Sequence, residues 1–363
     1  MNKKIKILYT IPNFDTAGSG KVVYDLVKGL DKSVFAPEIC VFHTRGAFFK
    51  EIENLGMPIH VFKFEADYRP FATLPFRVFK IARFFKKHRF DLIHSWHWSS
   101  DITEPLAAKL AGVPFVYTKK AMGWGNKSWL WRSKLSAKVI AINKDMMQEF
   151  FKDMPDKAIN LPLGVDTEAY KPQEQSESLK LELGLNSDDF VIISVVNMVP
   201  VKGIEILLNA VRLIDDPKIK VLIVGNDASD YAGNLKTEFT ENEIMFLGKK
   251  QNVKDYIALA NLFVIPTKNE GRKEGMPIAP LEAMAMGVPV IGSNISGIKD
   301  VLQDYPEFLF NPSDVKDLAM KISKFKNEKP IDISKLVSTV RQQFSLETFI
   351  EQRENVYKAL IKK

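Results

Sequence analysis

The sequence has one cysteine, five histidines and no long apolar run. The single cysteine, Cys40, excludes a disulfide framework and a cysteine-rich metal site, and it fits a reducing compartment. Five histidines argue against a multi-histidine metal centre. No apolar stretch approaches transmembrane length, and the apolar part of the N-terminal "MNKKIKILYTIPNF" is too short for a signal peptide. We therefore expect a cytoplasmic protein.

A complete phosphate-binding P-loop is also missing. The stretch "DTAGSGKVV", residues 15–23, contains a glycine-rich turn that is followed by a lysine. A P-loop needs glycine five residues before the glycine-lysine pair and Ser or Thr directly after the lysine, and Asp15 and Val22 occupy those positions here. What remains is a glycine-rich turn whose partner must lie elsewhere in the chain.

Positive charge is concentrated in the first half of the chain. Residues 1–165 carry 26 basic and 15 acidic side chains, a balance of +11, whereas the remainder has a balance of −4. This asymmetry indicates either an acidic partner for the N-terminal half or simply a basic, well-solvated surface. No recognisable nucleic-acid-binding module accompanies the basic residues, so we expect no nucleic-acid partner.

The order of short β-rich runs predicts two α/β domains with parallel sheets. A length of 363 residues exceeds one ordinary core. Six runs in the first half and five in the second read as strands with helical material between most of them, and a segment rich in Pro, Gly and polar residues separates the two series. We expect doubly wound, Rossmann-like domains at 1–165 and 166–345, a C-terminal helix at 346–363 that packs on the first domain, and a ligand site in a central cleft between the domains. The expected strands are "IKILYTI", "APEICVF", "IHVFKF", "FDLIHSW", "PFVYTK", "KVIAIN", then "FVIISVVNM", "KVLIVGN", "EIMFLG", "LFVIPT" and "VPVIGS".

The stretch "EGMPIAPLEAMAMGVPVIGS", residues 274–293, carries the densest chemical signal. Pro280 suits the first turn of a helix and Gly287 its C-terminal end, with a strand following. Backbone N–H groups near the helix start suit a diphosphate. Glu274 would then face the ligand from the loop and Glu282 from about one turn into the helix, where carboxylates can hold sugar hydroxyls. The alternative is a core helix that carries a surface glutamate.

These residues resemble family 4 of the glycosyltransferases, which has the GT-B fold. Glu274 and Glu282 match the family's E-x(7)-E motif, and the resemblance covers most of the chain. The similar segments are "EGMP…LEAMAMGVPVI", "VVNMVPVKGIEILLNAV", "PLGVDTEAY", "FDLIHSWH" and "FLGKKQNVKDYIALANLFVIPT".

The resemblance implies a retaining, metal-independent transfer of a sugar from a nucleotide donor, often a UDP-sugar. It implies that Glu282 binds the donor ribose, that Glu274 binds the transferred sugar and that Lys202 offsets diphosphate charge. His94 or His97 would line the sugar or acceptor side, although a structural role is open for either. The donor-binding residues that it implies are Gly18, Ser19, Gly20, Asn197, Lys202, Gln251, Asn252, Val253, Glu274, Gly275, Met276, Pro277, Ile278, Ala279, Leu281 and Glu282. No cofactor and no metal are expected.

The sequence departs from the family pattern at four places. Asn197 stands where arginine is usual, Leu163 replaces the asparagine of the usual "NGVD", and Gly-Ser-Gly replaces Gly-Gly. "TKKAMGWG" replaces a histidine-containing turn, so Lys119 and Lys120 are acceptor-side candidates. These changes leave two other functions open, a non-hydrolysing sugar-nucleotide epimerase and a catalytically silent nucleotide-sugar-binding protein. The leading interpretation is a transferase of cell-surface glycan synthesis, such as that of lipopolysaccharide or capsule.

The stretch "FRVFKIARFFKKHRF", residues 76–90, interleaves phenylalanines with basic side chains. On a helix, one apolar stripe of Phe76, Phe79, Ala82 and Phe85 or Phe84 would be flanked by Arg77, Lys80, Arg83 and Lys87. Such a helix can bind an anionic membrane surface peripherally. The alternative is that the stripe packs on the sheet.

Overall fold

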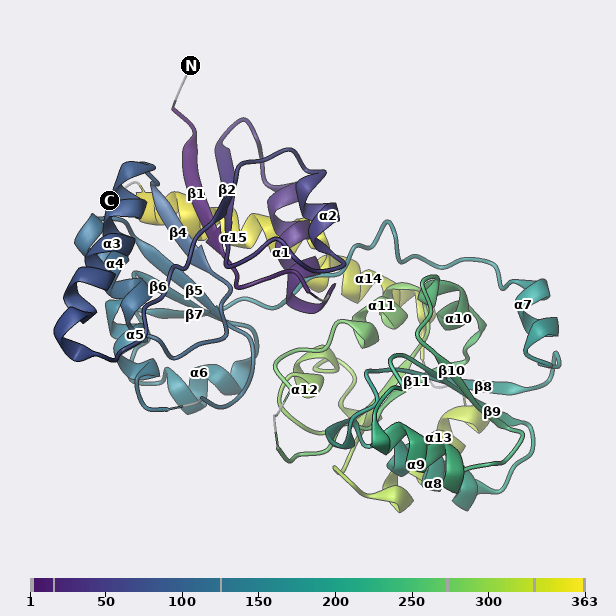
Figure 1. Cartoon of the computed structure of the whole chain (residues 1–363). Helices are drawn as coiled ribbons and strands as arrows, with labels where there is room; N and C mark the ends of the chain where they lie inside the picture. Colours follow the sequence, from purple (N-terminus) through teal and green to yellow (C-terminus); the bar gives the residue numbers. More distant parts are fainter. Residues whose placement is uncertain (1–2, 16, 125, 272–273, 329–330, 362–363) are drawn as a thin grey trace. The chain divides into compact units, whose positions relative to one another are not determined.

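The chain folds into two units, each built around one parallel sheet (Figure 1). The structure is a computed structural model, and it describes residues 3–15, 17–124, 126–271, 274–328 and 331–361. Unit 1 comprises Met1–Leu163 and Leu346–Lys363, and unit 2 comprises Gly164–Ser345. The chain therefore enters unit 2 once and returns to unit 1 for its last helix.

Unit 1 has a seven-stranded sheet in the order β3-β2-β1-β4-β5-β6-β7, with every strand pair parallel. The strand order of this sheet reverses at β1. The carboxyl ends of β1 and β4 therefore flank the switch point, which is where such sheets bind ligands. The strands are β1 (Ile5–Thr10), β2 (Phe35–Val41), β3 (Ile59–Val61), β4 (Leu92–Ser95), β5 (Phe115–Lys119), β6 (Lys138–Ala141) and β7 (Ala158–Asn160). The helices are α1 (Ala17–Gly29), α2 (Phe49–Glu53), η1 (Phe71–Thr73), α3 (Leu74–Lys87), α4 (Thr103–Ala111), α5 (Trp129–Leu135), α6 (Lys144–Phe150) and α15 (Leu346–Ile361).

Unit 2 repeats this topology with six parallel strands in the order β10-β9-β8-β11-β12-β13. The strands are β8 (Phe190–Val195), β9 (Ile219–Val224), β10 (Ile244–Gly248), β11 (Leu262–Ile265), β12 (Val290–Ser293) and β13 (Leu309–Phe310). The helices are α7 (Glu177–Glu182), η2 (Pro200–Lys202), α8 (Ile204–Ile214), α9 (Asp230–Glu238), α10 (Val253–Leu259), α11 (Ala279–Ala285), α12 (Ile298–Val301), η3 (Pro306–Phe308), α13 (Val315–Glu328) and α14 (Ile333–Phe344).

The predicted fold class, two doubly wound α/β domains, is confirmed. Strands such as β9 are nearly continuous runs of buried Val, Ile and Leu because helices cover both faces of a parallel sheet. All eleven predicted strands are present, and the short strands β7 and β13, of three and two residues, were not predicted. Helix α11 has Pro280 in its first turn and ends before Gly287, whose φ of +80° is left-handed, as predicted.

The C-terminal helix α15 packs in unit 1 beside α1, as the yellow helix of Figure 1 shows. Its guanidinium at Arg353 is fully buried and donates to the carbonyl oxygens of Leu161 and Pro162 at 3.2 and 2.9 Å. A carboxylate oxygen of Glu354 accepts the backbone N–H of Asp31 at 2.8 Å. The last helix is therefore bonded to two distant parts of the first unit.

Helix α3 has two apolar faces, which corrects the predicted single stripe. Ala82 and Phe85, predicted to share one stripe with Phe76 and Phe79, are 4% and 0% exposed and belong to the face that packs inward with Val78 and Ile81. Phe76 and Phe79 lie on the other face and are 76% and 63% exposed. Helical periodicity gives the faces of a helix but not which of them meets the sheet. Among the described residues, no helix has the length and apolar character needed to cross a bilayer.

Candidate functional site

In unit 2, the structure brings two of the predicted site residues into direct contact. Lys202 ends η2, in the loop that follows β8, and Glu274 lies in the loop that follows β11. The Lys202 ammonium donates to the Glu274 carboxylate at 2.5 Å, and the two side chains are only 19% and 22% exposed. β8 and β11 are neighbours at the point where strand order reverses, so this ion pair sits where doubly wound sheets bind ligands.

Close backbone approaches fix both loops. Gly203 has a φ of +62°, and a side chain there would meet the carbonyl oxygen of Pro266 at 2.4 Å. Gly297 has a φ of +81°, and a side chain there would meet the carbonyl oxygen of Gly275 at 2.2 Å. Only glycine fits such positions. The loop that carries Glu274 is therefore packed against the start of α12, while the turn after Lys202 is packed against the end of β11.

The other predicted donor residues of unit 2 also follow strand carboxyl ends. Asn197 follows β8 and is exposed, and residues 251–253 follow β10 and lead into α10. Glu282 lies in the first turn of α11 and is half-buried. The remaining residues of the motif, Gly275 to Leu281, run from the loop into that helix, and the structure holds no contact that tests their donor role.

Glu270 belongs to a different ion-pair group from Glu274. Lys268 lies 2.5 Å from Glu205 and 3.5 Å from Glu270, which is 63% exposed. The backbone N–H of Lys268 donates to the carbonyl of Val201 at 2.8 Å. The glutamates of the two Glu-Gly pairs of "NEGRKEG" thus have separate basic partners, although only two residues separate the pairs.

In unit 1, the glycine turn lies between β1 and the body of α1. The backbone at Gly18 departs from helical geometry, and a side chain at Gly20 would meet the Phe14 ring at 2.9 Å. Lys120, which follows β5, donates to the Ser19 hydroxyl at 3.1 Å and to the Trp96 carbonyl. The structure thus joins one acceptor-side candidate to the glycine turn, across the carboxyl ends of neighbouring strands.

The two histidine candidates have different surroundings. His94 is fully buried; its Nδ1 lies 2.6 Å from the Tyr357 hydroxyl and its Nε2 2.8 Å from the Thr118 hydroxyl. Burial holds the pKa of His94 well below its ordinary value, so the ring is neutral. With both nitrogens bonded inside unit 1, the structure favours the structural role for His94. His97 is less enclosed and lies 3.3 Å from the Glu65 carboxylate.

Lys119, the second acceptor-side candidate, faces the interior. Its side chain is nearly fully buried and donates to the carbonyl oxygens of Ala121 and, at 2.9 Å, Gly123. The ammonium lies 3.7 Å from the centre of the Trp124 ring. Burial lowers the pKa of Lys119 to about 7. These contacts hold the turn after β5 in place.

Sequence reasoning missed a buried charged cluster beside this site. The Glu104 carboxylate, on α4, accepts from the Thr10 hydroxyl at 2.5 Å, the Ser95 hydroxyl at 2.9 Å and the Arg132 guanidinium at 2.8 Å. Both charged side chains are fully buried. Burial raises the pKa of Glu104, while Arg132 and the Thr10 hydroxyl lower it. No sequence motif marks this cluster, which ties the ends of β1 and β4 to α4 and α5.

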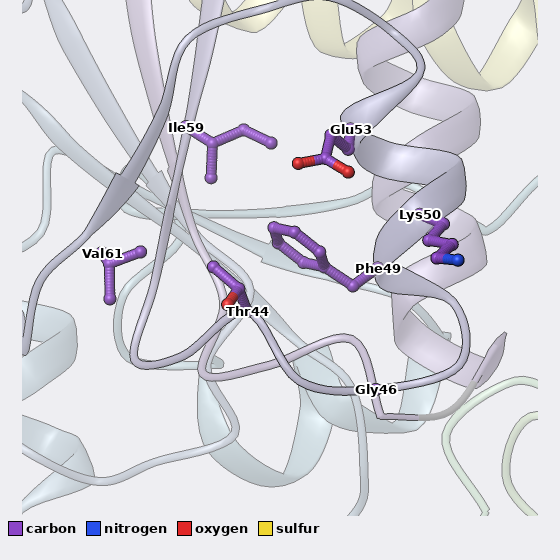
Figure 2. Close-up of a pocket in the computed structure, with 7 residues that line it drawn as sticks. All are labelled: Thr44, Gly46, Phe49, Lys50, Glu53, Ile59 and Val61. Carbon is purple, nitrogen blue, oxygen red and sulfur yellow. The ribbon is translucent and has the colours of Figure 1, made fainter.

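A pocket opens at the edge of the unit 1 sheet, between α2 and β3 (Figure 2). It has a volume of about 470 Å³. Figure 2 shows the Phe49 ring and the Glu53 carboxylate extending from α2 toward Ile59 and Val61, with Lys50 directed away. The loop that closes it is seated by Gly46 against residues 14–15, just before the glycine turn. This pocket was not predicted.

The described residues form no metal-binding cluster at either site. Within the part of the chain that the structure describes, no group of three or more His, Cys, Asp or Glu side chains is placed to hold a metal ion.

Two family models match consecutive parts of the chain. "Glycosyltransferase Family 4" matches residues 16–169, and "Glycosyl transferases group 1" matches residues 175–342. Together they cover most of units 1 and 2.

Curated relatives show moderate identity. TuaC of Bacillus subtilis (strain 168) is 29% identical over 212 residues, 57% of this chain and 52% of that protein, so the match spans about half of TuaC. An Escherichia coli UDP-Gal:alpha-D-GlcNAc-diphosphoundecaprenol alpha-1,3-galactosyltransferase is 26% identical over 70% of each chain. An N,N'-diacetylbacillosaminyl-diphospho-undecaprenol alpha-1,3-N-acetylgalactosaminyltransferase of Campylobacter jejuni is 24% identical over 82% of this chain and 84% of that protein.

Solved structures share the fold over nearly the whole chain. A glycosyltransferase from Rickettsia africae superposes with a TM-score of 0.86 at 20% identity, covering 99% of this chain and 100% of that one. Anabaena HepE in complex with UDP superposes with a TM-score of 0.81 at 22% identity, covering 98% and 100%. At these identities the likeness concerns the fold, and it agrees with the expected GT-B architecture.

Proposed function

We propose that this chain, which belongs to the group 1, family 4 glycosyltransferases, transfers a sugar from a UDP-sugar to a lipid-linked glycan acceptor in cell-surface polysaccharide synthesis. Support for the donor comes from the Escherichia coli relative, which is named for UDP-Gal, and from HepE, which was solved with UDP and with UDP-glucose. Support for the acceptor comes from two relatives named for sugars on diphospho-undecaprenol.

The Lys202–Glu274 ion pair is the observation that carries this proposal. When the bond between the sugar and the diphosphate breaks, negative charge grows on the departing oxygen and positive charge grows on the sugar carbon. A fixed ammonium stabilises the first charge and a fixed carboxylate the second. The pair holds both charges at one point of the unit 2 sheet, partly buried, where they interact more strongly than in water.

We further propose that the transfer retains the configuration of the sugar carbon and needs no metal. In a retaining transfer the new bond forms on the face from which the diphosphate leaves. Lys202 supplies the cation that a metal supplies in other transferases. We expect activity to persist after EDTA treatment; loss of transfer that magnesium or manganese restores would contradict this. The anomeric configuration of the product, read by NMR, tests retention.

A screen of nucleotide sugars by thermal shift tests the proposed function. A donor present at 100 times its Kd should stabilise the protein by about 2.7 kcal/mol. UDP-glucose, UDP-galactose and their N-acetyl forms are the first probes, each then offered with a GlcNAc-diphospholipid acceptor. Transfer supports the proposal. Turnover of the nucleotide sugar without acceptor indicates an epimerase, and binding without turnover indicates a silent binding protein.

We also propose that unit 1 binds an anionic membrane surface through the exposed face of α3. Phe76 and Phe79 are exposed although the helix already has an inward apolar face, and Lys80 and Arg83 lie exposed among them. Large exposed aromatic side chains flanked by cations fit an anionic lipid interface. A lipid-linked acceptor would be met at such a surface.

A further inference from the structure

An imidazole and a carboxyl group of unit 1 lie together at the carboxyl ends of its strands, and nothing above gives them a joint role. The His97 Nδ1 atom is 3.3 Å from a carboxylate oxygen of Glu65. His97 follows β4 and Glu65 follows β3, and the sheet order places β2 and β1 between these strands. The segment after β3 must therefore cross the ends of two strands to bring Glu65 to His97.

Packing holds that segment in place. The Phe64 ring lies 4.5 Å from the Phe42 ring, and both rings meet the His97 ring edge-on at 5.8 and 5.9 Å. The backbone N–H of Ala66 donates to the buried Thr103 hydroxyl at the start of α4, at 2.9 Å. The position of Glu65 beside His97 is thus built by aromatic packing on one side and by a buried hydrogen bond on the other.

The pair is partly enclosed and chemically adjustable. The side chains of His97 and Glu65 are 14% and 25% exposed. The His97 Nδ1 atom is buried and lies 3.3 Å from the Glu65 carboxylate oxygen without an aligned hydrogen bond, and contacts of this kind often tighten when a substrate binds. Among the described residues, no side chain forms a hydrogen bond with the Nε2 atom of His97. The ring therefore presents one nitrogen to Glu65 and keeps the other for a partner from outside.

The charge state of Glu65 decides what Nε2 can do. Burial raises the pKa of Glu65 to about 7 and lowers the pKa of His97 to about 3, so the ring is neutral and carries one proton. An ionised Glu65 accepts the proton of Nδ1, which leaves Nε2 as a hydrogen-bond acceptor. A protonated Glu65 donates to Nδ1, which leaves Nε2–H as a donor. The charged groups that face the pair are Asp101, Glu104, Arg132, Lys63 and Lys120.

We propose that Nε2 of His97 accepts a hydrogen bond from a hydroxyl of the acceptor sugar, and that Glu65 positions the ring and sets its tautomer. This rests on the glycosyl transfer proposed above. The neighbouring Lys120 joins the Trp96 carbonyl, directly before His97, to the Ser19 hydroxyl of the glycine turn, so the pair adjoins the turn. Sugar hydroxyls are both donors and acceptors, and a neutral imidazole nitrogen at the carboxyl ends of parallel strands matches their donor side.

The kinetic test separates acceptor binding from donor binding. With UDP-sugar saturating and a GlcNAc-diphospholipid varied, we expect the acceptor KM to fall about tenfold between pH 6 and pH 8 as Glu65 ionises. Glu65→Gln should remove this pH dependence. His97→Phe should raise the acceptor KM about tenfold at pH 8, because a lost hydrogen bond is worth up to about that factor, and should leave the donor KM unchanged. The matched control is Asp67→Asn, since Asp67 is exposed and paired with Lys63.

A second test needs no acceptor. Nitrogen-15 NMR of labelled histidine should show the proton of His97 moving from Nε2 to Nδ1 as the pH rises through about 7, and Glu65→Gln should abolish this change. A ring with the same tautomer from pH 6 to pH 8 would overturn the proposal, as would a pH-independent acceptor KM in the wild-type chain. If no nucleotide sugar binds but the tautomer changes as expected, the proposed function fails while the coupling of the pair stands.

Discussion

At the scale of single residues, Glu274 and Glu282 differ in what they touch. Glu274 is paired with Lys202 in a loop, whereas Glu282 is half-buried in the first turn of α11. In the proposed function Glu282 holds the ribose, which does not react, so its bonds are similar in the ground and transition states. Loss of such uniform binding raises KM and changes kcat less. We therefore expect Glu282→Gln to raise the donor KM by about ten- to a hundredfold.

Glu274 is expected to behave differently because it faces growing positive charge on the sugar. Its contribution is larger in the transition state than before it, so Glu274→Gln should mainly lower kcat, by about ten- to a hundredfold. Steady-state kinetics with varied donor separate the two effects. Glu270→Gln is the control, because Glu270 is exposed and pairs with Lys268. If Glu270→Gln abolished transfer while Glu274→Gln left it unchanged, the assignment of the motif to Glu274 would be wrong.

His94 gives a prediction about stability and pH. The free-chain pKa of histidine is about 6.5, and burial keeps the pKa of His94 far lower in the folded state. Below about pH 6.5 the unfolded chain therefore binds a proton that the folded chain does not, and this group costs stability as the pH falls. His94→Gln should lower the stability of unit 1 by about 1–3 kcal/mol at pH 7.5. Between pH 7.5 and pH 5.5, the variant should lose less stability than the wild type.

Tryptophan fluorescence during urea unfolding measures this effect in unit 1 alone, because all five tryptophans lie between residues 96 and 131. Tyr357→Phe is the matched control: it removes the hydroxyl that meets His94 but keeps the titrating ring, so it should lose stability and keep the full pH slope. A change in the acceptor or donor KM of His94→Gln without a change in stability would instead place His94 at the substrate.

The role of a residue could be predicted only where a local sequence pattern indicates it. The glutamates of the motif have seven residues between them and lie on a loop and a helix that the sequence marks with Pro280 and Gly287. The bond between His94 and Tyr357 joins residues 263 positions apart, and no local pattern records it. Glu65 likewise has no motif, because it reaches His97 only through the path of the chain over the sheet.

At the scale of elements, α3 yields a prediction about membranes. Its inward face is complete without Phe76 and Phe79, so replacing them should not disturb the core. The double change Phe76→Ser with Phe79→Ser should abolish sedimentation with vesicles of anionic phosphatidylglycerol in phosphatidylcholine. Lys80→Gln with Arg83→Gln should weaken binding, by about 1 kcal/mol per removed cation, and wild-type binding should weaken with salt.

The control for this experiment is a similar change in unit 2. Leu181 on α7 is 81% exposed, and Leu181→Ser should leave vesicle binding unchanged. Equal sedimentation of the wild type with neutral and anionic vesicles would contradict the proposal. The same helix shows how far sequence reasoning extends at this scale, since amphipathic periodicity predicted the helix but placed Ala82 and Phe85 on the same face as Phe76 and Phe79.

At the scale of the whole molecule, the chain's return to unit 1 makes its last helix part of the first core. Arg353 is fully buried against the carbonyl oxygens of Leu161 and Pro162, Tyr357 against His94, and Glu354 receives the backbone N–H of Asp31. Removal of α15 would leave several of these buried polar groups without partners and would open the surface that it covers. Each unpaired buried group costs about 1–3 kcal/mol, and a domain of this size is stable by only about 5–15 kcal/mol.

We therefore expect deletion of residues 346–363 to unfold unit 1 while unit 2 stays folded. The tryptophan emission should shift to the red, since every tryptophan lies in unit 1, whereas a UDP-sugar found by the thermal-shift screen should still stabilise a residual transition. Glu351→Ala is the control, because that side chain is exposed on the same helix and its loss should leave the emission unchanged. Native tryptophan emission after the deletion would show that α15 only covers unit 1, and that the core of this unit is complete by Leu163.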